Sequence, residues 1–303
     1  GYEIKLSNNH TCNGKPFQDI CDILAGKYPK DFQWTGWHPL CYSDDSEVLT
    51  NRGWKLFKDV LDDDLILSLN PESRNVEWVG ISDRQCYKYE GEMIHFFNRS
   101  LDCLVTPEHQ MIYLNKSDGR IKRCSASLYN KGKGAFYRGC EYEGKEVMRI
   151  VIGNTIIPFD LFCEFMGYWL SDGSTIRKSQ IVIAQQDGES AKPYIVSCIS
   201  NMGFEPHSSY DKVSFYNTDI CQYLKQFGRC ASKYVPHQIK NASRRQIRIF
   251  LDAFIKCDGY IKKPKPFIGN RGGYCMGCEE RIYYTTSKLL ASDLGEMILK
   301  VGK

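Results

Sequence analysis

The chain has 303 residues, of which 42% are hydrophobic and 13% aromatic, which is enough to bury the cores of about two domains and excludes a disordered tail. No apolar run approaches the roughly 20 residues of a membrane-spanning helix, and the opening GYEIKLSNNH is not a signal peptide, so we expect no membrane partner. The net charge of +4 divides into −2 over residues 1–157 and +6 over residues 158–303, which favours a polyanionic partner for the second part over a solvated charged face.

The fourteen cysteines are scattered through apolar stretches, a pattern typical of reduced thiols in a cytoplasmic protein rather than of a disulfide framework. Cys275 and Cys278 have zinc-ligand spacing, but only one such pair is present. Four residues of the first segment could gather around a metal, with ordinary packing as the favoured alternative: His10, Cys12, Cys21 and His38.

The first two segments differ in their patterns. Residues 1–40 are rich in Asn, Cys and aromatic side chains, with a helical period only over Phe17–Leu24. Residues 41–157 contain short runs of strand character, separated by Asn, Gly, Asp and Pro at intervals of about ten residues. These runs include EVLT, ILSL, VEWVG, MIHFF, CLVT, MIYL and VMRIVIG. The second segment is therefore predicted to be all-β, either barrel-like or horseshoe-shaped.

Residues 158–303 mix helical and strand patterns and contain an internal repeat. The first predicted helix has Asp160 as its N-cap, runs through LFCEFMGYWL and ends at Asp172-Gly173. The second runs from Arg244 through IRIFLDAFIK to Asp258-Gly259. Each is followed by a strand-like tract and a further helix, so the two halves of this segment have the same plan.

The repeat places a carboxylate at the end of each helix. Gly167 and Ala253 occupy the same register, and small residues there let two helices approach closely and cross. If the helices pack about a pseudo-twofold axis, Asp172 and Asp258 emerge side by side and repel one another unless cations lie between them. Mg²⁺ prefers such oxygen ligands, and a pair of divalent ions can activate water for phosphodiester hydrolysis.

At these residues the chain resembles the LAGLIDADG homing endonucleases. The segment from Met166 to Gly173 (MGYWLSDG) is similar to the first family motif, and that from Leu251 to Gly259 (LDAFIKCDG) is similar to the second. Ser232-Lys233-Tyr-Val-Pro236 resembles the lysine-bearing element between them. The resemblance covers residues 158–303 and implies a monomeric, pseudo-twofold α/β nuclease that cuts double-stranded DNA at a long site.

The resemblance also implies roles for single residues. Asp172 and Asp258 would bind Mg²⁺ or another divalent cation, and Lys233 would stabilise charge or tune the attacking water. Family members carry a further strand and helix beyond the point where this chain ends, so we expect a C-terminally truncated domain. From the local basic excess we expect five side chains to contact the DNA backbone: Arg244, Arg245, Lys262, Lys263 and Lys265.

The preceding β segment begins at Cys41 and contains Val105-Thr-Pro-Glu-His109, and this combination resembles the Hint-type splicing domain of an intein. A cysteine thiolate is a suitable nucleophile for the carbonyl carbon of Leu40, and a histidine is a suitable acid for the leaving amide nitrogen. The resemblance therefore implies that Cys41 attacks Leu40, with Thr106 and His109 assisting and no cofactor required.

Complete splicing needs more than this sequence contains. The family ends in His-Asn followed by Cys, Ser or Thr, and no His-Asn dipeptide is present. We therefore expect at most thioester formation or cleavage at the N-terminal junction. Residues 1–40 would belong to a host protein attached in cis. The stretch around Gly-Trp-His-Pro resembles Mu-like phage head-morphogenesis proteins, which implies a phage-infected or bacterial cytoplasm.

These observations predict a multi-domain chain. Residues 1–40 form a host fragment, residues 41–157 an incomplete all-β Hint horseshoe, and residues 158–303 an α/β pseudo-twofold endonuclease. Two alternatives stay open at this point. One is a structural phage minor head protein carrying inactive inserted domains. The other is a free-standing homing endonuclease with a β DNA-binding domain in front.

Overall fold

The computed structural model divides into two compact units, residues 1–141 and residues 142–302. It describes the following residues: 2–6, 11–12, 15–16, 42–43, 45–70, 72–86, 88–98, 101–129, 132, 134–136, 141–268, 274–276 and 279–302. The division lies before the predicted boundary at 157/158, because the hairpin of β14 (Arg149–Ile152) and β15 (Thr155–Pro158) packs against the first long helix of the second unit. No helix in the described ranges has the length and hydropathy needed to cross a bilayer.

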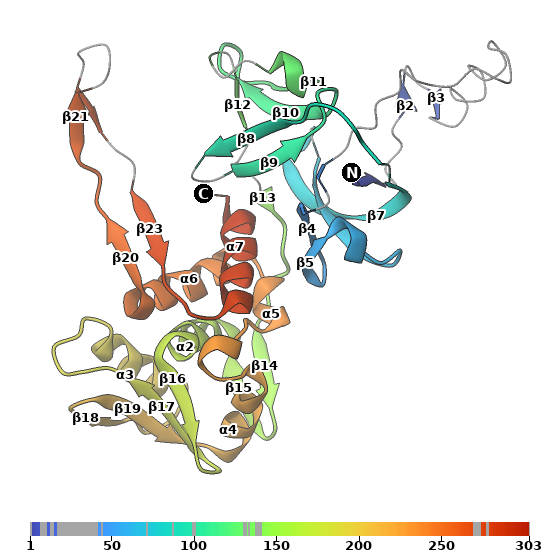
Figure 1. The fold of residues 1–303 in the computed structure, drawn as a ribbon. Helices are drawn as coiled ribbons and strands as arrows, with labels where there is room; N and C mark the ends of the chain where they lie inside the picture. The colour runs from blue at the N-terminus through green and yellow to red at the C-terminus, as the bar shows by residue number, and fades with distance from the viewer. Residues whose placement is uncertain are drawn as a thin grey trace, which may run out of the picture. The chain divides into compact units, whose positions relative to one another are not determined.

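The larger sheet of the first unit is antiparallel and built from short strands (Figure 1). Five of its strands are, in spatial order, β1 (Tyr2–Leu6), β7 (Asn75–Cys86), β6 (Leu65–Leu69), β4 (Glu47–Thr50) and β5 (Gly53–Leu56), and the sixth, β13 (Glu141–Tyr142), pairs with β7 outside this order. Ile66 and Val79 face each other across β6 and β7, and both side chains are buried. A separate pair is formed by β2 (Thr11–Cys12) and β3 (Lys15–Pro16), and a single 3₁₀ turn, η1 (Phe57–Asp59), follows β5.

The remaining strands of this unit form two smaller sheets around an aromatic cluster. They are β8 (Ile94–Asn98) with β9 (Leu101–Val105), and β10 (Gln110–Asn115) between β11 (Ile121–Ser125) and β12 (Gly134–Phe136). The cluster centres on Phe96, Val105 and Met111, and Tyr129 stacks on Phe136 with ring centroids 4.5 Å apart. The 3₁₀ turn η2 (Ala126–Leu128) contributes the buried Ala126 to it.

The predicted all-β horseshoe is wrong. A horseshoe needs strands that continue one curved sheet, whereas the described strands divide into separate antiparallel sheets with two 3₁₀ turns among them. The physical reason lies in the strands themselves, most of which have only two to six residues and are too short to continue from one sheet into the next. The apolar residues Phe96, Val105 and Met111 therefore gather as a local cluster between small sheets.

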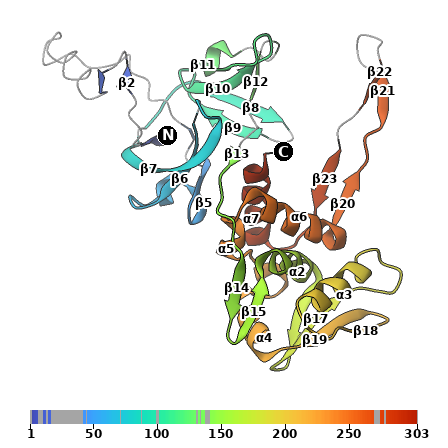
Figure 2. The ribbon, with the colours of Figure 1, turned by 180° about the vertical axis from the view of Figure 1, so that it is seen from behind.

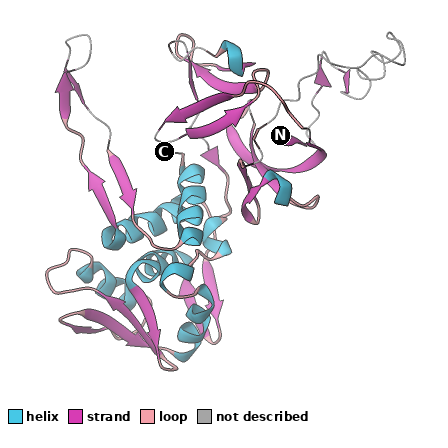
Figure 3. Cartoon of the chain, viewed as in Figure 1, coloured by secondary structure: helices cyan, strands magenta, loops and turns pink. Residues whose placement is uncertain are grey.

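The second unit is organised around two long helices, α2 (Phe159–Asp172) and α6 (Arg244–Asp258). Figure 2 shows the same unit from behind, and Figure 3 shows that helices are concentrated in this part of the chain. A four-stranded antiparallel sheet follows α2, in the order β16 (Gly173–Ile176), β17 (Gln180–Ala184), β19 (Lys212–Tyr216) and β18 (His207–Ser209). The shorter helical segments are α3 (Lys192–Asn201), α4 (Thr218–Leu224), η3 (Lys225–Phe227), η4 (Cys230–Ser232) and α5 (His237–Lys240).

The strands after α6 do not reproduce that four-stranded sheet, so the predicted pseudo-twofold α/β fold is wrong as well. They form a long two-stranded arm in two pieces (Figure 1). The pieces are β20 (Gly259–Lys262) with β23 (Glu280–Tyr283), and β21 (Pro266–Ile268) with β22 (Tyr274–Met276), and α7 (Lys288–Val301) follows. Pro264 and Pro266 lack the backbone N–H that a sheet ladder needs, which explains the break in the arm.

The entry to α2 also differs from the prediction. The N-cap is Pro158 rather than Asp160, and Asp160 lies in the first turn. Its carboxylate accepts hydrogen bonds from Arg245 (2.5 and 2.8 Å) and Gln246 (2.8 Å) at the start of α6. Asp160 thus joins the N-terminal ends of the two helices, and α2 and α6 run parallel to one another.

Candidate active site

The parallel helices α2 and α6 touch at a glycine. A Cβ added to Gly167 would lie 2.6 Å from the carbonyl oxygen of Phe250 and 2.7 Å from the Cβ of Ala253. Contacts this short leave no room for any side chain at position 167, because Cβ atoms do not approach backbone oxygens so closely. The prediction that Gly167 and Ala253 allow close helix packing is confirmed.

The residue after each aspartate must be glycine for the same steric reason in both repeats. A Cβ on Gly173 would lie 2.3 Å from the side chain of Trp169, and a Cβ on Gly259 would lie 2.3 Å from that of Ile255. In each case the neighbour is the residue four positions earlier, on the last turn of the helix. Glycine therefore lets the chain turn from helix into strand directly beside the carboxylate.

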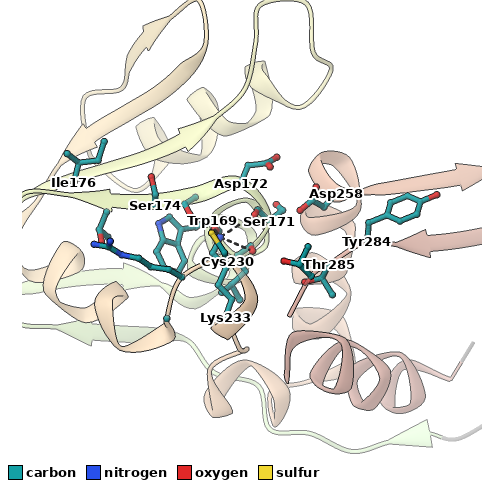
Figure 4. A pocket seen from close by; sticks show the side chains of 16 residues that line it. Trp169, Ser171, Asp172, Ser174, Ile176, Cys230, Lys233, Asp258, Tyr284 and Thr285 are labelled. Atoms are coloured by element: carbon teal, nitrogen blue, oxygen red, sulfur yellow. Dashed lines mark hydrogen bonds between the residues drawn. The ribbon is translucent and has the colours of Figure 1, made fainter. Parts of the chain in front are cut away.

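Asp172 and Asp258 line one pocket of about 710 Å³, which we call the carboxylate pocket (Figure 4). The ends of α2 and α6 form its floor, together with Gly173. The rest of its lining comes from the start of β16, the residues around η4 and the residues after β23: Ser174, Thr175, Ile176, Gly228, Arg229, Cys230, Lys233, Tyr284, Thr285 and Thr286. Both carboxylates also line a second pocket of about 730 Å³ that includes Gln185 and Glu189. The helix pair therefore presents the two carboxylates to the same open space.

The electrostatics of this pocket disfavour two negative charges. Burial and the neighbouring charge of Asp258 raise the pKa of Asp172 to about 6, and burial raises the pKa of Asp258 too. Lys233 opposes both shifts, and Gln185 donates a hydrogen bond to Asp172 (Nε2 to Oδ2, 2.7 Å) that opposes the first. The C-terminal ends of α2 and α6 add partial negative charge. Both carboxyl groups therefore lose their protons less readily in this pocket than in water.

Lys233 is buried, with 6% of its surface exposed, and its ammonium group caps α2. Its Nζ donates to the carbonyl oxygens of Trp169 (3.0 Å), Leu170 (3.1 Å), Ser171 (3.2 Å) and Gly173 (2.9 Å). The last carbonyls of a helix have no N–H partner within it, so this side chain satisfies them. Burial lowers the pKa of Lys233. Its predicted effect on an attacking water stays a prediction.

Helix α7 fixes the segment that carries Lys233, which the sequence did not indicate. The hydroxyl of Ser287 donates to the carbonyl of Lys233 (2.6 Å), and Asp293 accepts from the N–H of Val235 (2.7 Å). Lys240 Nζ lies 2.7 Å from Asp293, which keeps that buried carboxylate paired. The hydrogen bond from Gln185 to Asp172 was not predicted from the sequence either. The position of Gln185 at the end of a strand-like run next to Asp187-Gly188 gave no signal that it would reach Asp172.

The predicted DNA contacts lie in two places. Arg244 donates to the carbonyl of Val301, and Arg245 is paired with Glu146 and Asp160. Both begin the 15-residue helix α6, about 20 Å along its axis from Asp258. Lys262, Lys263 and Lys265 are exposed at the base of the arm, where Lys262 pairs with Glu280 at 2.8 Å. The described residues include no hydrogen-bond or ion-pair partner for Lys263 and Lys265.

A second group of predicted site residues lies in the first unit. Thr106 is fully buried, and the N–H of His109 donates to the Thr106 carbonyl (3.1 Å) in a tight turn. Tyr42 bridges to Val105, next to Thr106, and its ring meets the His109 ring edge-on with centroids 4.4 Å apart. Burial raises the pKa of Tyr42 to about 12. The residue that follows Cys41 in the chain is therefore held against His109.

Some predicted positions lie outside the described residues. These are Leu40 and Cys41, the residues His10, Cys21 and His38 that could gather around a metal, and Cys278. For Cys12 and Cys275 only the strands that contain them are described. Among the side chains within the described ranges, no three of His, Cys, Asp or Glu gather closely enough to hold a metal ion by themselves.

Comparison with known proteins gives two relatives at low identity, and no protein-family model matches the chain. One relative is named ATP-dependent Clp protease proteolytic subunit, from Chlamydomonas moewusii, and is 23% identical over 298 residues, covering 87% of this chain. The other is named DNA-directed RNA polymerase subunit beta C-terminal section, from Stigeoclonium helveticum, and is 27% identical over 315 residues, covering 86% of this chain. The chain spans 28% of the length of each.

Proposed function

We propose that residues 142–302 form a metal-dependent DNA endonuclease carried within an inserted protein segment. The observation that carries this proposal is the pair Asp172 and Asp258, brought by parallel helices to one pocket with raised carboxyl pKa values. Holding two carboxylates at the negative ends of two helices is unfavourable without added positive charge. An arrangement of that kind is typical of a cation site rather than of structural packing.

The donor atoms fit a hard divalent cation. Asp172 and Asp258 offer only carboxylate oxygens, and Mg²⁺ commonly takes one or two carboxylates, with water and substrate phosphate completing its shell. Lys233 offsets this repulsion only in part, because the pKa values of both carboxyl groups stay raised although its charge lowers them. When bound, such a cation lowers the pKa of water and stabilises the leaving oxygen of a phosphodiester. Asp172 and Asp258 would hold it, and Gln185 would keep Asp172 oriented.

Double-stranded DNA is the substrate that the charge distribution supports. The excess of +6 over residues 158–303 favours a polyanion. At the base of the two-stranded arm, Lys262, Lys263 and Lys265 are exposed. A two-stranded ribbon fits the major groove of B-form DNA. The arm leads directly from Asp258 through β20, so a duplex bound along it would extend toward the carboxylate pocket.

The two relatives support insertion rather than a protease or a polymerase activity. Their names describe unrelated activities, yet each aligns with nearly the same share of this chain and over only 28% of its own length. A segment shared between proteins of unrelated names is what a self-contained inserted element produces. We therefore propose that the aligned segment, and not the activity named for either relative, is common to the three proteins.

The proposal is tested on a plasmid that carries the host gene without the inserted segment. We expect the purified chain with Mg²⁺ to convert this supercoiled plasmid to linear DNA, as measured by agarose electrophoresis. The same plasmid carrying the interrupted gene, and reactions with EDTA, are the controls. Equal cleavage of both plasmids, or no cleavage of either over a range of Mg²⁺ and Mn²⁺ concentrations, would refute a site-specific endonuclease.

We also propose a second function for the first unit, an acyl shift at the Leu40–Cys41 bond. The supporting observation is that Tyr42 bridges to Val105 and packs on His109, beside buried Thr106. In this step the Cys41 thiol gives up its proton to solvent and its sulfur bonds to the carbonyl carbon of Leu40. The bond from that carbon to the Cys41 nitrogen breaks, and His109 supplies the proton that this nitrogen gains and recovers one from solvent. The product is a thioester, which an added thiol can open.

We expect a small thiol such as mercaptoethanesulfonate to release residues 1–40 from the full chain, as measured by mass spectrometry of both products. Cys41→Ala removes the nucleophile and should abolish release, and His109→Ala should slow it by about 100-fold. Cys86→Ala removes an exposed thiol of the same unit and serves as the control. Release that persists in the Cys41→Ala variant would rule out the acyl shift.

A further inference from the structure

The turn of residues 228–232 presents an arginine to the carboxylate pocket. Gly228 has a φ of 74°, and a Cβ there would lie 2.5 Å from the Ser232 carbonyl oxygen, so the turn depends on glycine. Ser232 closes it: its Oγ accepts from the Arg229 N–H (3.0 Å) and donates to the Arg229 carbonyl (2.9 Å). These bonds use only the backbone of Arg229. The turn therefore fixes the backbone position of Arg229, and these bonds leave its guanidinium group free to contact a ligand.

Arg229 and Lys233 are the two cationic residues that line this pocket, and they differ in what they contact. The ammonium group of Lys233 is buried and donates to four carbonyl oxygens. Arg229 is exposed, and the described residues include no carboxylate paired with its side chain. Arg229 is thus a cationic residue of the pocket lining whose side chain pairs with no carboxylate among the described residues, and the same pocket is lined by Asp172 and Asp258.

We propose that Arg229 contacts a non-bridging oxygen of the phosphate that is cut, which makes it a catalytic residue. This inference rests on the proposed endonuclease function. A guanidinium group presents two parallel N–H donors that match a phosphate, and these bonds strengthen as charge grows on the phosphoryl oxygens. In hydrolysis the attacking water gives up one proton to solvent as its oxygen bonds to phosphorus, the bond from phosphorus to the leaving oxygen breaks, and the leaving oxygen gains a proton from solvent. Arg229 transfers no proton and stabilises only the charge.

The two cations would then have separate roles. Lys233 holds the end of α2 and so the position of Asp172, whereas Arg229 meets the substrate. A phosphate contact made only for affinity would change KM and the dependence on salt, because each such contact releases counterions from the DNA. A contact that strengthens in the transition state lowers kcat instead.

The test compares Arg229→Gln, Arg229→Lys and Lys225→Ala in the full chain. Lys225 is exposed, four residues earlier, and outside the pocket lining, so its variant controls for the loss of one charge. On the plasmid that lacks the insertion, we expect Arg229→Gln to lower kcat by about 100-fold with KM nearly unchanged. Arg229→Lys should recover part of the loss, and Lys225→Ala should cut at the wild-type rate.

Two further measurements distinguish a wrong role for Arg229 from a wrong function for the chain. They are Mn²⁺ binding, monitored by electron paramagnetic resonance, and thermal unfolding. Both should match the wild type in Arg229→Gln. An unchanged kcat, or an effect confined to KM and the salt dependence, would overturn the role of Arg229 while leaving the endonuclease in place. Failure of the wild-type chain to cut the plasmid or bind Mn²⁺ would instead overturn the proposed function itself.

Discussion

Replacing Asp172 with Asn is expected to abolish metal-dependent cleavage and, at the same time, to stabilise the second unit at neutral pH. Asn keeps a side-chain oxygen that can accept the hydrogen bond from Gln185 but removes the charge that would hold a cation. Because a metal ion contributes several kcal/mol to transition-state stabilisation, we expect cleavage to fall by at least about 1,000-fold. Asp258→Asn should have the same effect on cleavage, and both variants should lose binding of Mn²⁺.

The stabilising effect follows from the direction of the pKa shift. The pKa of Asp172 is about 6 in the folded chain and 3.8 for the ordinary side chain. Between these values the folded state binds more protons, so stability falls as the pH rises from about 4 to about 6. Near pH 7 the charged carboxylate costs about 1–2 kcal/mol, allowing for partial exposure to solvent. Asp172→Asn should recover this energy and reduce the decline of stability with pH.

The measurement is urea unfolding of the wild type and of both variants at pH 4 and pH 7, without divalent cations, beside the cleavage assay. Asp252→Asn is the matched control, because Asp252 is exposed on α6 and pairs with Arg281 instead of lining the pocket. It should keep full cleavage. If Asp172→Asn and Asp258→Asn both cut DNA at the wild-type rate, the two carboxylates do not bind the catalytic ion.

Lys233→Met is expected to lower the free energy of unfolding of the second unit by about 3–5 kcal/mol. Methionine keeps most of the buried stem but removes the ammonium group, which leaves the carbonyl oxygens of Trp169, Leu170, Ser171 and Gly173 without this donor. Each buried carbonyl that loses its partner costs about 1–3 kcal/mol, although some will gain water from the open pocket. The end of α2 should then fray and displace Asp172.

Chemical unfolding followed by far-UV circular dichroism measures this effect. Lys225→Met, an exposed lysine, should change stability by less than about 0.5 kcal/mol. A loss in Lys233→Met as small as in that control would mean that water replaces the ammonium group and that Lys233 does not cap α2. A loss of cleavage with unchanged stability would point instead to a direct part in catalysis.

Local predictions from the sequence were most successful at positions where the packing allows only one type of residue. Gly167 could be interpreted without coordinates because a small residue in register with Ala253 has little other role on a buried helix face. The Asp-Gly pairs indicated where α2 and α6 end, since glycine is needed there to leave the helix beside Trp169 and Ile255. By contrast, Asp160 resembled an N-cap from its position alone, and its contact with Arg245 depends on a helix that starts 84 residues later.

Sheet organisation was predicted poorly for a related reason. Short alternating strands indicate that a segment is β, but strand pairing is decided by partners distant in the sequence. The first unit therefore proved to contain several small sheets around Phe96 and its neighbours, and Pro264 and Pro266 interrupt the arm after β20.

By itself the sequence indicated the two carboxylates, the small residues at the helix crossing and the Thr106/His109 motif, because each is a local pattern with its own steric or chemical requirement. Only the tertiary structure decided what surrounds them. Gln185, Ser287 and Asp293 reach the site through contacts between elements far apart in the chain. The same packing buries Lys233 against the carbonyl oxygens at the end of α2 and leaves Arg229 exposed in the lining of the pocket, a difference that depends on burial and cannot be derived from two basic residues in the sequence.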